Sequence, residues 1–98
     1  MNTEMYKFVI DGIAYDNRTL ETTKEQKIKI LRELTTQNII EFEGIDLFTQ
    51  INASLSIYNE ERSEEIKNKI SYWVNRYNAA KIKVLYALSN DEIDNIIL

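Results

Sequence analysis

Five residues in the C-terminal half of the chain combine positive charge with aromatic rings at helical spacing. They are Lys69, Tyr72, Arg76, Lys83 and Tyr86, and the small residue Ala79 completes their three- and four-residue spacing. That spacing would place them along one flank of a helix. Between Ile66 and Ser89 the chain has five basic residues and no acidic residue, although its net charge is −4. Cations attract phosphates or an acidic protein surface, and tyrosine rings supply rigid contact area. This basic-aromatic flank is the first candidate for a partner-binding surface.

The same pattern is also typical of an ordinary solvated helix face, and more often so. Lysine and arginine side chains extend along the edges of a buried stripe, and tyrosines there commonly close the core. Cations are also favoured near the C-terminal end of a helix. The sequence therefore leaves both interpretations of the flank open.

Acidic residues gather in two other groups. The first comprises Glu41, Glu43 and Asp46, and the second comprises Glu60, Glu61, Glu64 and Glu65. Closely spaced carboxylates could imitate a phosphate backbone and occupy the nucleic-acid site of a basic partner. The stronger alternative is structural, because carboxylates are favoured at a helix N-terminus or pair with a basic helix of the same chain.

The last three residues, Ile96, Ile97 and Leu98, are all aliphatic. Chain ends are usually polar and frayed, so three consecutive aliphatic residues indicate docking. The dock is either the protein's own core or a second subunit in a homo-oligomer. Trp73 is predicted to be a core anchor rather than an interface residue, because it lies at the centre of an apolar stripe.

The residues that most enzymes need are largely missing. The chain has no histidine and no cysteine, and its two glycines are Gly12 and Gly44. It therefore lacks the usual general base, thiolate chemistry, disulfides and a glycine-rich phosphate loop. Carboxylate, lysine or tyrosine catalysis stays open in principle. We expect a non-enzymatic protein with no cofactor and no metal site.

The sequence also bears on location. No apolar run approaches the ~20 residues that a membrane-spanning helix needs. The opening residues 1–6 have neither a basic region nor an apolar one, so they do not resemble a signal peptide. We therefore expect a cytoplasmic protein that does not bind membranes.

One long amphipathic helix near residues 62–89 is the clearest predicted element. Its apolar stripe consists of Ile66, Ile70, Trp73, Tyr77, Ala80, Val84 and Leu88. These positions follow each other by three or four residues, as one side of a helix requires. Ser89, three residues before Glu92, predicts the cap of a short terminal helix.

The N-terminal half contains less regular signals. Residues 6–10 and 13–15 predict a β-hairpin around the turn Asp11-Gly12, which should pack onto the helices. A helix should begin near Thr22 or Thr23, and residues 39–43 form either a short third strand or an irregular connection. Asp46 should cap a second helix, whose apolar residues Leu47, Phe48, Ile51, Leu55 and Tyr58 line one side.

These elements predict a single, mostly helical α+β domain over residues 1–98, with an N-terminal hairpin packed on three to four helices. We favour a break near Asn59, although residues 46–88 could also form one continuous helix. The 98-residue length leaves little room for a second domain.

The function expected from these features is a non-enzymatic module that binds another protein or protein complex. In size and composition the chain is similar to small phage accessory proteins, including tail-assembly chaperones and inhibitors of host defence such as anti-CRISPR proteins. That resemblance carries no motif, and it implies an inhibitor of a larger nucleic-acid-handling or defence complex. One alternative is a nucleic-acid-binding accessory protein that uses the basic helix, although the negative net charge of the chain disfavours it. The other is a self-associating assembly factor, such as a phage tail-assembly chaperone.

Overall fold

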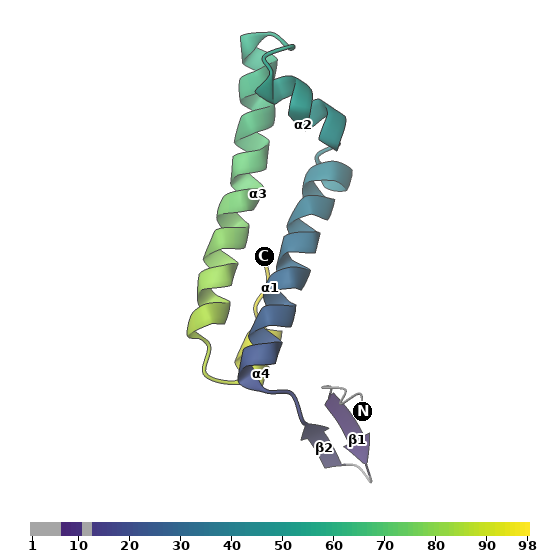
Figure 1. The fold of residues 1–98 in the computed structure, drawn as a ribbon, viewed down its shortest axis with the longest axis vertical. Coiled ribbons are helices and arrows are strands. Elements are labelled where there is room, and N and C mark those ends of the chain that lie inside the picture. The colour runs from purple at the N-terminus through teal and green to yellow at the C-terminus, as the bar shows by residue number, and fades with distance from the viewer. Residues whose placement is uncertain (1–6, 11–12) are drawn as a thin grey trace.

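The computed structural model describes residues 7–10 and 13–98 of the chain. Figure 1 shows two long helices side by side, with a short helix at one end of the pair and two strands beyond the other end. In chain order the elements are β1 (Lys7–Ile10), β2 (Ile13–Asp16), α1 (Leu20–Gln37), the π-helix η1 (Asn38–Phe42), α2 (Leu47–Ser54), α3 (Glu60–Tyr86) and α4 (Asn90–Asp94).

Helices α1 and α3 run in opposite directions and form the body of the protein (Figure 1). Two groups of buried side chains pack the helices together. The group beside α4 consists of Leu31, Ala80, Val84, Ala87 and Ile93. The group beside α2 consists of Ile39, Ile45, Ala53 and Ile66. Each fully buried Val, Leu or Ile side chain stabilises the fold by about 1.5–3 kcal/mol, so these two groups position α2 and α4 on the body.

The predicted long helix is present as α3, although it begins and ends two to three residues earlier than residues 62–89. The break near Asn59 is confirmed, because the side-chain oxygen of Asn59 accepts a hydrogen bond from the backbone N–H of Arg62 at 2.8 Å. Residues 46–88 therefore form two helices, α2 and α3.

The apolar stripe of α3 is buried or half-buried from Ile66 to Val84, as its spacing predicts. Its last predicted member, Leu88, is 86% exposed. The helix ends at Tyr86 because Ala87 has an extended backbone (φ −65°, ψ 144°). Leu88 therefore no longer follows the helical repeat that placed it on the stripe.

Helix α1 begins earlier than its sequence signal. Thr19 is the cap, since its hydroxyl oxygen accepts from the backbone N–H of Thr22 at 3.1 Å. The predicted caps Thr22 and Thr23 both lie inside the helix. The sequence pattern missed Thr19 because a capping box needs Glu or Gln three residues later, and that position is Thr22.

The predicted caps of α2 and α4 are confirmed. Asp46 accepts from the backbone N–H of Thr49 at 2.8 Å. Ser89 accepts from the backbone N–H of Glu92 at 3.1 Å, and the Glu92 carboxylate accepts from the backbone N–H of Leu88 at 2.9 Å. These bonds satisfy donors that a helix start otherwise leaves unpaired.

Residues 39–43, expected to be a short strand or an irregular connection, mostly continue α1 as the π-helix η1. The backbone N–H of Glu43 donates to the carbonyl of Asn38 at 3.0 Å, which is the five-residue step of a π turn. The isoleucines and the phenylalanine of this segment imitate a strand in composition. Gly44 follows with a φ of +68°, a left-handed conformation that favours glycine after a helix.

The α+β class predicted from the sequence is wrong, because among the residues that the structure describes only helices pack together. β1 and β2 pair antiparallel with each other, Lys7 opposite Asp16 and Ile10 opposite Ile13. They lie beyond the ends of α1 and α4 rather than on the helices (Figure 1). A pair of strands with neither a third strand nor a helix packed on it does not form a stable sheet layer. The predicted turn Asp11-Gly12 and Tyr6 lie outside the described residues.

A charged cluster joins the end of β2 to α4. Arg18 donates to Asp16 at 2.8 and 2.9 Å and to Asp94 at 2.7 and 2.9 Å. The hydrogen bonds to Asp16, and then those to Asp94, raise the pKa of Arg18. The hydrogen bond from the Arg18 side chain holds the pKa of Asp16 well below its usual range. The side-chain amide of Asn90 adds a bond to the Arg18 carbonyl at 2.9 Å.

Candidate interaction surface

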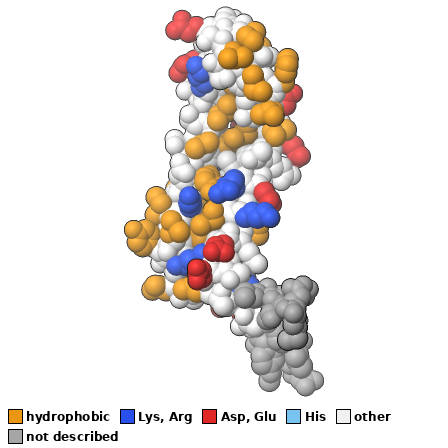
Figure 2. All heavy atoms as spheres, in the orientation of Figure 1, with side chains coloured by type: hydrophobic (Ala, Val, Ile, Leu, Met, Phe, Trp, Pro, Cys, Tyr) orange, Lys and Arg blue, Asp and Glu red, His pale blue; other side chains and the backbone are white. Residues whose placement is uncertain are grey.

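The apolar side of α2 faces solvent. Leu47, Phe48, Ile51 and the C-cap residue Leu55 are 66%, 71%, 47% and 66% exposed. We call these four residues the α2 apolar face. At about 100° per residue they share one side of the helix, and Figure 2 shows hydrophobic side chains gathered at this end of the molecule. Four of the five residues predicted for this stripe therefore share one side of the helix, but the structure turns that side away from the body. The fifth, Tyr58, lies beyond the end of α2 and packs against the core group beside α2.

The opposite side of α2 is small and polar, and it holds the helix on α3. Ala53 is fully buried there. The side-chain amide of Gln50 donates to the Ile45 carbonyl at 3.1 Å, and that of Asn52 donates to the Tyr58 hydroxyl at 3.3 Å. The hydrogen bond from the Asn52 side chain is the main reason why the pKa of Tyr58 is lowered. These contacts fix the rotation of α2 and so direct its apolar face outward.

Part of the basic-aromatic flank forms a cluster around Trp73. The rings of Tyr72 and Trp73 meet edge to face with centroids 5.3 Å apart. The Arg76 guanidinium lies 5.4 Å from the Tyr72 ring centroid and 5.2 Å from that of Trp73, and it donates to the Tyr72 hydroxyl at 2.6 Å. Lys69 lies 3.8 Å from Glu43 and 3.4 Å from Glu65. Both cations of this cluster therefore already have partners within the chain.

The rest of the flank is separate from that cluster. Tyr86 is 80% exposed and Lys83 is also exposed, near the C-terminal end of α3. The 1.5 Å rise per residue puts Tyr86 about 21 Å along the helix from Tyr72. Arg76 also donates to the backbone oxygen of Leu98 at 2.6 Å, which brings the C-terminal segment against the flank. The five predicted residues therefore do not form one continuous basic surface.

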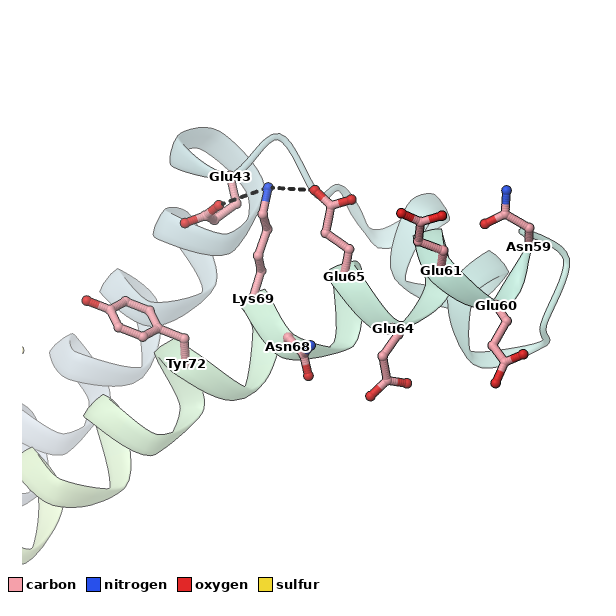
Figure 3. A pocket seen from close by; sticks show the side chains of 9 residues that line it. All are labelled: Glu43, Asn59, Glu60, Glu61, Glu64, Glu65, Asn68, Lys69 and Tyr72. Atoms are coloured by element: carbon pink, nitrogen blue, oxygen red, sulfur yellow. Dashed lines mark ion pairs between the residues drawn. The ribbon is translucent and has the colours of Figure 1, made fainter.

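Five of the seven predicted acidic residues line one open groove of about 1170 Å³. They are Glu43, Glu60, Glu61, Glu64 and Glu65, together with Asn59, Asn68, Lys69 and Tyr72. Figure 3 shows Lys69 reaching between Glu43 and Glu65, while Glu60 and Glu64 point to the other side of α3. The carboxylates that line the groove therefore do not converge on one point.

The other two predicted acids have local roles. Glu41 accepts from the side-chain amide of Gln37 at 3.1 Å. Asp46 caps α2, and the hydrogen bond from the Thr49 backbone N–H lowers the pKa of Asp46. Asp46 nevertheless adds its negative charge immediately beside the α2 apolar face.

The C-terminal aliphatic residues separate by their surroundings. Ile96 and Leu98 are partly buried against the core group of Leu31 and Val84, so they dock on the protein's own body. Ile97 is 80% exposed. Ile82, Leu85, Tyr86 and Leu88 are also exposed, at and just beyond the end of α3 that is far from α2.

Within residues 7–10 and 13–98, no group of three or more carboxylates is arranged to hold a metal ion. In that same part of the chain, none of the helices is both long and apolar enough to cross a membrane.

Trp73 and the outward rotation of α2 are the features that the sequence did not reveal as part of a surface. Trp73 is partly buried in the core group beside α2, as predicted, but its ring also carries the Arg76 and Tyr72 contacts. Its indole N–H donates to Glu43 at 3.2 Å. The three-residue helical spacing from Trp73 to Arg76 was the available sequence signal. Comparisons with protein families, with characterised proteins and with solved structures found no match for this chain.

Proposed function

We propose that this chain is a non-enzymatic protein-binding module and that the α2 apolar face is its binding site. The observation that carries the proposal is an amphipathic helix whose apolar side is turned to solvent and whose polar side is packed. Exposed apolar area costs about 25 cal/mol per Å² relative to burial. Contiguous apolar patches on soluble proteins commonly mark sites that a partner covers.

The charged flank supports a nucleic-acid site less well than the sequence suggested. Lys69 and Arg76 would have to leave Glu43, Glu65 and the Leu98 backbone oxygen to reach a phosphate. The chain is also acidic overall, with a net charge of −4, which opposes association with nucleic acid. We therefore keep protein binding as the proposed function, in a cytoplasmic setting.

The proposal is tested by capturing partners from the source cells with a tagged chain. The test variant replaces Phe48 and Ile51 by serine. Its matched control is Ile82→Ser, since Ile82 is also exposed (56%) but lies far from α2. It is about 24 Å along α3 from Ile66, which is the α3 residue that packs beside Ala53 of α2. Quantitative mass spectrometry should find partners retained by the native chain and by Ile82→Ser but lost from the double variant. An identical set of captured proteins from all three chains would contradict the proposal.

A further inference from the structure

The α2 apolar face lies in the most acidic part of the molecule. Residues 38–66 contain seven acidic residues and one basic residue, Arg62, a net charge of −6. The whole chain has a net charge of −4, so the remaining residues together carry +2. Negative charge is therefore concentrated on the segments that form η1, α2 and the start of α3.

These carboxylates are only partly neutralised within the chain. Lys69 pairs with Glu43 and Glu65, whereas Glu60 and Glu64 point away from Lys69 on the other side of α3 (Figure 3). Glu60 and Glu61 begin α3 within six residues of Leu55, the last member of the α2 apolar face. Figure 2 shows acidic side chains on either side of the hydrophobic cluster at this end. The surface is therefore an apolar centre with a negative rim.

We propose that the occupant of this surface is a basic amphipathic helix of another protein, an inference that rests on the proposed function above. The apolar side of such a helix would cover Phe48, Ile51 and their neighbours. Its lysines and arginines would meet the rim carboxylates, where opposite charge speeds association and selects the partner. The α2 helix has eight residues, about 12 Å, which matches roughly two turns of a helix laid along it.

The charge distribution also argues against two other occupants. A symmetric dimer through this face would bring two segments of charge −6 together, and like charges repel at such contact distances. A bilayer with anionic lipids would repel the same rim. A basic helix is the occupant for which both the apolar centre and the rim contribute favourable free energy.

The experiment measures binding of fluorescein-labelled 18-residue peptides to the full chain by fluorescence anisotropy. The first peptide contains leucine and lysine with leucines at three- and four-residue spacing. The second has glutamate in place of lysine, and the third is a scrambled leucine-lysine peptide with no apolar side. Three protein variants are compared. The first combines Phe48→Ser and Ile51→Ser, and the second combines Glu60→Gln, Glu61→Gln and Glu64→Gln. The third is the control Ile82→Ser.

We expect the amphipathic leucine-lysine peptide to bind at least ten-fold more tightly than the other two peptides. The serine double variant should lose at least ten-fold in affinity, and the glutamine variant should bind several-fold more weakly with a flatter salt dependence. Ile82→Ser should bind like the native chain. Circular dichroism of each variant shows whether it keeps its helices, and ten-fold weaker binding by a folded serine variant supports the inference.

Two outcomes would overturn the inference. One is equal affinity for the lysine and glutamate peptides. The other is sedimentation showing that the chain self-associates through Phe48, which would assign the face to a second copy. If cellular partners are still lost from the serine variant while the peptides show no preference for lysine, the proposed function stands and only the basic partner is wrong. If neither assay responds to the serine variant, the proposed function fails as well.

Discussion

Arg18 is the residue that ties the strands to the helical body. Its guanidinium is shared between Asp16 at the end of β2 and Asp94 at the end of α4, and its side chain is only 13% exposed. Asp16 lies two residues before Arg18 in the sequence, whereas Asp94 lies 76 residues after it. The two carboxylates therefore share one cation only in the folded chain. Such a contact has no local sequence signal.

Replacing Arg18 by glutamine should lower the free energy of unfolding by about 1 kcal/mol at pH 7, because the charge-assisted hydrogen bonds are lost. Asp16 has a lowered pKa in the folded protein, so its contribution is present above its unfolded pKa of about 3.9 and is lost as the pH falls further. The difference between the native chain and Arg18→Gln should therefore shrink below about pH 4.

Urea unfolding followed by far-UV circular dichroism at pH 7 and pH 3 measures this difference. Arg32→Gln is the matched control, since Arg32 is an exposed arginine on α1, and it should leave stability within about 0.5 kcal/mol of the native chain. A loss of the same size at both pH values would show that the ionised Asp16 carboxylate does not stabilise the fold through Arg18.

Helix α2 shows what sequence periodicity cannot decide at the scale of an element. The sequence places Leu47, Phe48 and Ile51 on one side of a capped helix, and the structure confirms the helix and its cap Asp46. The side that packs is instead the one with Ala53, whose small side chain allows close approach to α3. Periodicity defines an apolar side of a helix, but it does not show what covers that side.

The serine double variant at Phe48 and Ile51 should therefore be nearly as stable as the native chain, within about 0.5 kcal/mol, because both residues are exposed on the surface of α2. Ala53→Val should cost about 1–3 kcal/mol, since added methyl groups would overfill a buried contact. Urea unfolding of the two variants checks this contrast. Marked destabilisation of the serine variant would mean that the face is packed in the free protein.

The molecule as a whole is extended. Its Cα radius of gyration is 18.1 Å, whereas a compact domain of this length has about 13 Å. Its accessible surface is 7257 Å², against about 5,800 Å² for a compact monomer of 11.6 kDa. Two long helices with one shared seam bury little, and the excess of about 1,450 Å² is larger than the ~800 Å² that one partner covers at a standard interface.

Small-angle X-ray scattering should accordingly give a radius of gyration near 18 Å for the free chain. The value should not change with protein concentration if the α2 apolar face is reserved for another protein. A radius near 13 Å would contradict the extended arrangement, because it would require the helices to fold into a compact bundle. Growth of the radius with concentration would indicate self-association.

The sequence by itself determined the local features of this protein. The stripe from Ile66 to Val84, the caps Asp46 and Ser89 and the break at Asn59 were predictable. Each depends on residues within a few positions of one another, where helix geometry and backbone hydrogen bonding decide the outcome. The sequence also showed directly that the chain has no histidine and no cysteine, and so lacks imidazole and thiolate chemistry.

Only the tertiary structure decided how the elements pack and which surface is left open. It made residues 38–42 a π-helix, left the strands off the helical body and directed the α2 apolar face outward. It also divided the basic-aromatic flank by pairing Lys69 with Glu43 and Arg76 with Leu98. These outcomes depend on contacts between residues distant in the chain, which local propensity does not encode.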